Sequence, residues 1–97
     1  MRKITQEALK AFYNKKRFKK NNTEVYVGEF TTILLLFTHP IAYLHHNNND
    51  LEITTAGYNT STTRDRLNSI PGVHVTSRKG QLRLNGAEWD GKLIKIY

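Results

Sequence analysis

The chain has 97 residues, of which 38% are hydrophobic and ten are aromatic, so it holds enough apolar material for one folded core and is not expected to be disordered. It contains no cysteine, which excludes disulfides, thiolate catalysis and thiolate zinc sites. Its longest purely apolar run, at 33–37, is far shorter than the ~20 residues that a membrane-spanning helix needs. We therefore expect neither secretion nor membrane insertion.

The net charge of +7 is confined to the first fifth of the chain. Residues 1–20 hold eight basic residues against Glu7 alone, whereas residues 21–97 hold seven basic and seven acidic residues. Such an asymmetry is typical of a protein with an anionic partner. We predict a single domain over 1–97, in which a basic helix and loop at 1–22 precede a β-rich body at 23–97.

The first expected element is a helix that begins at Thr5. Thr5 is a suitable N-cap, Glu7 would lie in the first turn, and Ile4 and Leu9 have the spacing of a hydrophobic staple. The helical pattern breaks near Asn14, and its apolar side consists of Ile4, Ala8, Leu9, Ala11, Phe12 and Tyr13. The basic run that follows would form the last helical turn and a loop, near the negative end of the helix dipole.

That run, "NKKRFKKNN" at 14–22, places five basic residues around Phe18. One interpretation is that the cations only end the helix while Phe18 enters the core. The other is a phosphate-binding surface whose aromatic ring stacks on a base, as in proteins that bind single strands. The second interpretation predicts five nucleic-acid-binding residues: Lys15, Lys16, Arg17, Lys19 and Lys20.

Strands are expected from residue 23 onward. The segments 23–30 and 31–37 are rich in β-branched and aromatic residues, and the second is so continuously apolar that it predicts a central strand covered on both faces. Pro40 separates this strand from 41–46. An Asn-rich turn then joins 41–46 to 51–57 as a hairpin.

A short second helix is expected next. Thr62 and Asp65 have the spacing of a capping box, and Pro71 with Gly72 ends the element. Three strands are expected after this helix, at 73–77 and 81–85 and, as the closing strand, at 92–97. Turn dipeptides at 85–86 and 90–91 lie between the last two of them. The order predicts an α+β fold: a mostly antiparallel sheet of five to seven strands packed against the N-terminal helix and the short second helix.

The hydroxyl-rich segment "NTSTTR" is a second candidate for phosphate binding. A helix start, several hydroxyls and the guanidinium groups of Arg64 and Arg66 would together receive a phosphate. The alternative is ordinary capping, with Arg66 paired to an acidic neighbour, Asp65 or Glu52. If this segment shares a face with the N-terminal run, one continuous positive track would extend over Arg78 and Lys79.

Metal and catalytic sites find little support in the residue pattern. His45 and His46 are adjacent in an expected strand, so they point to opposite faces and cannot ligate one ion without a bulge. The eight acidic residues are scattered, and no nucleophile setting is present. We expect no metal, no cofactor and no enzymatic activity.

Several motifs together resemble a group of small proteins encoded by tailed phages and prophages. The resemblance is carried by "ITTAGYNTSTTRDRLNSIPGV" and "QLRLNGAEWDG", together with "NT" at 22–23 and "ITQEALKAF" near the start. Tyr58 stands where that pattern has Trp, and the basic run is heavier than the pattern implies. The resemblance implies a phage accessory protein of the bacterial host cytoplasm, with a signature of turns, caps and apolar anchors that describes a scaffold.

Two functions follow as expectations. The first is weakly sequence-specific binding of nucleic acid, DNA or RNA, through the basic N-terminal segment with Arg64 and Arg66 as further contacts. The alternative is a protein-binding inhibitor of a host system such as a CRISPR or restriction defence, with a host protein or nucleoprotein as partner. That role needs an exposed aromatic patch, for which the candidates are Tyr13, Phe18, Tyr26, Tyr58 and Tyr97.

Overall fold

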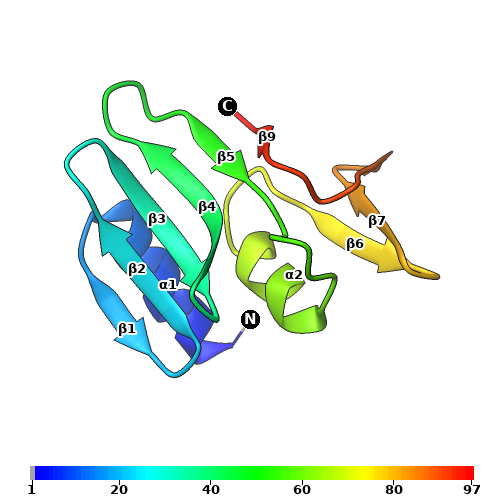
Figure 1. Cartoon of the computed structure of the whole chain (residues 1–97), viewed down its shortest axis with the longest axis horizontal. Helices are drawn as coiled ribbons and strands as arrows, with labels where there is room; N and C mark the ends of the chain where they lie inside the picture. Colours follow the sequence, from blue (N-terminus) through cyan, green and yellow to red (C-terminus); the bar gives the residue numbers. More distant parts are fainter. Residues whose placement is uncertain (1) are drawn as a thin grey trace.

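The computed structural model describes residues 2–97, in which two helices and nine strands form an α+β fold (Figure 1). The helices are α1, Lys3–Tyr13, and α2, Ser61–Asn68. The strands are β1, Phe18–Lys20; β2, Thr23–Val27; β3, Thr31–Leu36; β4, His39–His45; β5, Leu51–Ile53; β6, Val75–Arg78; β7, Gln81–Leu84; β8, Ala87–Glu88; and β9, Ile94–Lys95. Neither described helix is long and apolar enough to cross a membrane.

The strands form two antiparallel sheets. Strands β1 to β5 follow one another in chain order, and β9 pairs with β5 to complete a six-stranded sheet. The remaining strands, β6, β7 and β8, form a separate three-stranded sheet. The predicted α+β class, the hairpin of β4 and β5, and the closing C-terminal strand are confirmed.

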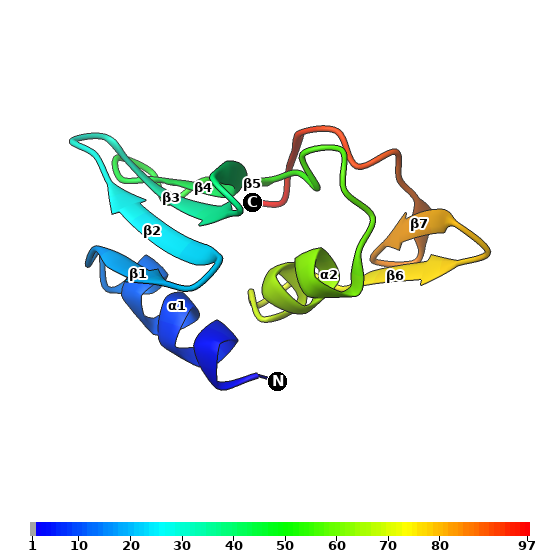
Figure 2. The same ribbon diagram turned by 60° about the horizontal axis from the view of Figure 1, so that its bottom comes forward.

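Both helices lie on the same side of the six-stranded sheet, as Figure 2 shows. Helix α1 contacts β1, β2 and β3, while α2 contacts β4 and β6. The core lies between these layers, where fully buried side chains such as Phe12 of α1 and Leu67 of α2 meet Leu34 and Ile53 of the sheet. Among residues 2–97, no helix packs on the opposite face of the sheet, which is called the open face.

Strand β3 shows the consequence of that one-sided packing. Its burial alternates, so that Leu34 and Leu36 are buried beneath the helices while Ile33 and Leu35 are partly exposed on the open face. The prediction that this strand is covered on both faces is wrong, because the strand is apolar on both sides but both helices pack on one.

The start of α1 also differs from the prediction. The helix begins at Lys3, with Arg2 as an N-cap that makes no side-chain capping hydrogen bond. Thr5 is therefore not the N-cap, and Glu7 does not lie in the first turn. Thr5 is instead buried within the helix, where its hydroxyl takes part in contacts with α2. A tertiary partner has thus overridden a local capping preference.

The end of α1 is where the sequence predicts it. Asn14 is the C-cap, and Lys15 adopts a left-handed conformation with φ of 53°. The Lys16 amide then donates to the Ala11 carbonyl at 2.9 Å, which is the Schellman pattern of helix termination. Beyond this turn, however, the basic run is not a loop throughout, because residues 18–20 form β1.

Helix α2 begins at a different hydroxyl from the one predicted. Thr60 is the N-cap, and its side-chain oxygen accepts from the Thr63 amide at 3.1 Å, so the proposed capping box of Thr62 with Asp65 is wrong. The helix ends at Asn68, before Pro71, as expected.

Candidate nucleic-acid interface

Strand β1 divides the basic run between the two faces of the sheet. Phe18 points toward the helices and packs, partly buried, against the core. Lys19 alternates to the open face, and Lys20 returns to the helix side, where its Nζ lies 3.7 Å from Glu7 Oε1. Lys20 is therefore engaged by a carboxylate of α1 and does not belong with the cations of the open face.

Arg17 and Lys19 border the open face. The Arg17 guanidinium carbon lies 4.9 Å from the centroid of the Tyr26 ring, a cation–π contact. Lys19 is the cross-strand partner of Glu24. Lys15 and Lys16 are exposed in the link between α1 and β1. Four of the five predicted cations of the run thus gather at one edge of the sheet.

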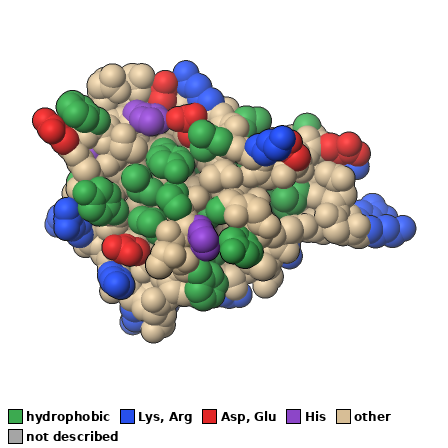
Figure 3. All heavy atoms as spheres, viewed as in Figure 1, with side chains coloured by type: hydrophobic (Ala, Val, Ile, Leu, Met, Phe, Trp, Pro, Cys, Tyr) green, Lys and Arg blue, Asp and Glu red, His purple; other side chains and the backbone are tan. Residues whose placement is uncertain are grey.

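An apolar row crosses the open face beside this edge. Tyr26 of β2 pairs with Ile33 of β3, which pairs with Tyr43 of β4, so the three side chains stand side by side on the same face. Tyr26 is 45% exposed, and Ile33, Tyr43 and the neighbouring Leu35 are partly exposed. Figure 3 shows hydrophobic side chains gathered on this face over β2 to β4.

The sequence interpretation missed Tyr43, Ile33 and Leu35 as surface residues. The available signal was the alternation within the segment "IAYLHH", in which Tyr43 falls between the buried Ala42 and Leu44. That pattern fixes which residues share a face, but it does not reveal that the second face is uncovered.

The two adjacent histidines diverge, as predicted. His45 Nε2 lies 2.7 Å from Glu52 Oε1 on the open face. His46 Nε2 lies 2.6 Å from the hydroxyl of Thr32, which is buried on the helix side. Within residues 2–97, no group of three or more His, Asp or Glu side chains is placed to hold a metal ion.

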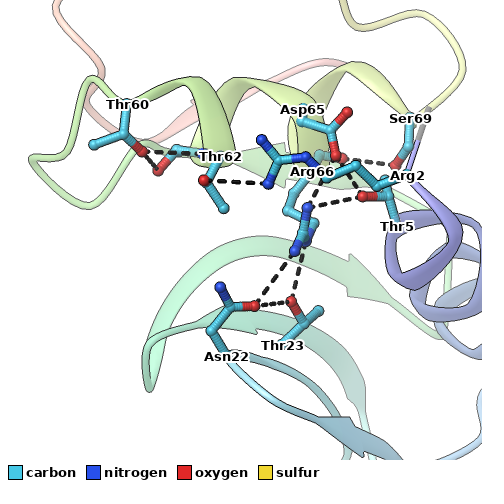
Figure 4. A network of polar contacts seen from close by, with 10 residues as sticks. Arg2, Thr5, Asn22, Thr23, Thr60, Thr62, Asp65, Arg66 and Ser69 are labelled. Carbon is cyan, nitrogen blue, oxygen red and sulfur yellow. Dashed lines mark hydrogen bonds and ion pairs between the residues drawn. The ribbon is translucent and has the colours of Figure 1, made fainter.

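Arg66 lies in the interior, at the meeting point of α1, α2 and the turn before β2 (Figure 4). Its side chain is 2% exposed. Its Nε donates to Thr23 Oγ1 at 3.0 Å, and its Nη1 donates to Thr5 Oγ1 at 2.8 Å and to Asp65 Oδ2 at 2.9 Å. Its Nη2 donates to Asn22 Oδ1 at 3.3 Å. Every nitrogen of the guanidinium group therefore has a partner within the fold.

The burial of Arg66 decides between the two interpretations of its segment. Burial lowers the pKa of the Arg66 guanidinium from its ordinary value, and the neighbouring Asp65 carboxylate opposes that shift. The pairing with Asp65 is confirmed. The assignment of Arg66 as a nucleic-acid contact is corrected, because a side chain enclosed on all sides cannot reach a phosphate.

The remaining predicted cations do not extend the group of four formed by Lys15, Lys16, Arg17 and Lys19. Arg64, on α2, donates from Nη1 to Asn59 Oδ1 at 2.5 Å, and Asn59 in turn donates to the Ser77 hydroxyl at 3.1 Å. Arg78 and Lys79 lie at the turn of the β6–β7 hairpin, at the opposite end of the molecule from β1 (Figure 1). The expected continuous positive track is therefore wrong.

The fold and this surface define a class of small α+β protein, in which two helices cover one face of an antiparallel sheet and a basic strand forms its edge. A family described as Kyanoviridae Gp96 protein matches residues 1–92, and the chain belongs to this family. The prediction of a phage protein is thereby confirmed. No curated protein and no solved structure is significantly similar to the chain.

Proposed function

We propose that the protein binds nucleic acid, DNA or RNA, through its basic edge, defined as Lys15, Lys16, Arg17 and Lys19, in the cytoplasm of the bacterial host. One observation carries the proposal: these four exposed cations are adjacent, and among residues 2–97 none of them forms an ion pair with a carboxylate. Cations that are not neutralised within the fold are free to replace the counterions of a polyanion.

The basic edge favours phosphates over base edges. Its side chains come from a loop and an edge strand rather than from a helix shaped to enter the major groove. Contacts from such flexible cations fix affinity and carry no sequence information. We therefore expect binding with little sequence preference, and the proposal includes no catalytic step.

Salt dependence tests this proposal. If the four cations neutralise about four phosphates, affinity should fall about 50-fold for single strands, or about 150-fold for duplex, between ~50 and ~200 mM salt. Replacing all four with glutamine should remove most of the affinity and most of that slope. The measurement is fluorescence anisotropy of labelled oligonucleotides over a salt series.

The matched control removes the same amount of charge from the other end of the molecule. Arg78, Lys79, Arg83 and Lys92 are exposed, so their replacement with glutamine leaves the same net charge as the variant of the basic edge. The control should keep the affinity and slope of the native protein. Equal losses in both variants would show that only net charge matters, and the assignment of the basic edge would be wrong.

A second candidate function is inhibition of a host defence system through protein binding. The observation that favours it is the apolar open face, since exposed apolar patches commonly mark interfaces. Of the five aromatic candidates, Phe18 packs against the core, and the Tyr13 hydroxyl lies 3.0 Å from the Tyr97 hydroxyl. Burial and that contact raise the pKa of Tyr13. Tyr26, Tyr58 and Tyr97 are exposed, at 45%, 49% and 47%.

One substitution in the open face and the glutamine variant of the basic edge test the protein-binding function. Leu35→Glu places a charge in the open face and should reduce the capture of a host protein from nuclease-treated lysate at least about tenfold, as loss of an interface anchor does. The glutamine variant of the basic edge should leave that capture unchanged. Capture that is lost with the basic edge and unaffected by Leu35→Glu would contradict the open face as the protein-binding surface.

A further inference from the structure

We infer that the nucleic acid is single-stranded and that its bases stack on an open-face strip, defined as Tyr26, Ile33, Leu35 and Tyr43. This inference rests on the proposed function and adds the form of the ligand and the place of its bases. The basic edge alone would bind the phosphates of a duplex as well as those of a single strand. The strip, in contrast, could not stack on the bases of a duplex. Both the geometry of the strip and the charges of the open face favour a single strand.

The geometry of the strip suits separated bases. Tyr26 and Tyr43 are each cross-strand partners of Ile33, so their side chains lie two strand spacings apart. At ~4.8 Å for each spacing, the two rings stand about 10 Å apart. Successive bases of an extended strand can lie flat on such a surface, since every base has a π face. In a duplex those faces are already stacked on one another.

The charges around the strip determine which side of the bound strand holds the phosphates and which side holds the bases. The Arg17 guanidinium lies over the Tyr26 ring, with its carbon 4.9 Å from the ring centroid, so a base that stacks on this face would displace Arg17 and leave it beside the phosphate of that base. Two carboxylates border the strip directly: Glu24 is the cross-strand neighbour of both Leu35 and Lys19, and Glu52 is the cross-strand neighbour of Tyr43 and lies 2.7 Å from His45. The phosphate next to the base on Tyr26 should therefore contact the basic edge, while the following bases continue across the sheet over the strip toward Tyr43.

The same charges favour nucleic acid over a protein as the occupant. Arg17 and Lys19 of the basic edge border the strip, and residues 21–97 carry no net charge. A partner that covers the strip must therefore also face the basic edge, and a single strand supplies both a polyanion and planar apolar rings. Single-strand binders combine these two features, a positive groove and aromatic stacking positions.

The test compares three ligands on the full chain. They are a labelled oligothymidine of about 20 nucleotides, which exceeds a footprint of ~4–16 nucleotides, a duplex of the same length, and inorganic polyphosphate as a polyanion without bases. We expect the oligothymidine to bind at least about tenfold more tightly than the duplex at moderate salt, since stacking contributes about 5- to 150-fold for each base. Polyphosphate should compete weakly.

Substitutions then locate the stacking. Tyr43→Leu keeps an apolar side chain but removes the ring, so it should weaken oligothymidine binding at least about fivefold and leave duplex binding unchanged. Tyr26→Leu should do the same at a more exposed position, where loss of folding is less of a concern. Tyr58→Leu is the matched control, because Tyr58 is exposed outside the strip and should have no effect.

The outcomes separate the inference from the proposed function. Equal affinity for single strand and duplex, equal competition by polyphosphate, or unchanged binding by both strip variants would overturn the stacking inference and leave the basic edge as a polyanion site. Absence of binding to either nucleic acid at low salt would overturn both. A protein partner lost on Tyr43→Leu, with oligothymidine binding unaffected, would assign the strip to that protein and also overturn the inference.

Discussion

Replacing Arg66 with alanine is expected to lower the free energy of unfolding by about 3–5 kcal/mol, the range found when one partner of a buried ion pair is removed. The substitution removes the only group that contacts Thr5 of α1, Thr23 of β2 and Asp65 of α2 together among the described residues. It leaves a cavity and partners without their donor. At about 4 °C or more per kcal/mol, the melting temperature should fall by at least about 12 °C.

Arg64 provides the control for this prediction. It lies on the same helix and is partly exposed, and its hydrogen bond is to a loop residue, Asn59. Arg64→Ala should cost less than about 1 kcal/mol, as surface substitutions do. Arg66→Lys should also lower the stability, because an ammonium group cannot reach acceptors on three sides as the guanidinium fork does. Similar melting temperatures for Arg64→Ala and Arg66→Ala would contradict the structural role of Arg66.

Replacing Gly91 with alanine is expected to lower the free energy of unfolding by about 2–5 kcal/mol. Gly91 has φ of +83°, which costs a side-chain residue about 1–2 kcal/mol. An added methyl group would also overlap the hydroxyl of Thr55, and overpacking contributes about 1–3 kcal/mol. The Gly91 carbonyl accepts from the Thr55 amide at 3.0 Å, so the backbone cannot easily move away. Thermal or urea unfolding measures the loss.

Gly86 is the control that distinguishes the cost of a positive φ from the cost of the steric overlap at Gly91. Its φ is +88°, but the space beside it is open, so Gly86→Ala should show the cost of the backbone conformation alone. Thr55→Ala removes the overlapping hydroxyl, so the double variant with Gly91→Ala should lose less stability than the two single losses together. Equal losses for Gly86→Ala and Gly91→Ala would show that the Thr55 contact is unimportant.

Local features were predictable because they depend on neighbouring residues. The end of α1 near Asn14, the hairpin of β4 and β5, and the stop after α2 all follow from periodicity and turn chemistry. The starts of both helices were not predictable, because several residues near each start could act as a cap. Thr5 has a suitable side chain for an N-cap, but its hydroxyl contacts Asp65, 60 residues away in sequence.

The sequence by itself determined where the charge lies, where the chain turns and which residues alternate between faces, since these depend on residue type and on short-range backbone geometry. Only the tertiary structure decided that Arg66 is enclosed while Arg17 is exposed over the Tyr26 ring, and that one face of β3 is open. Likewise, Gly86 and Gly91 occur in similar turn dipeptides, yet only Gly91 meets Thr55. The physical reason is that burial depends on which distant segments pack together, and a local pattern does not specify them.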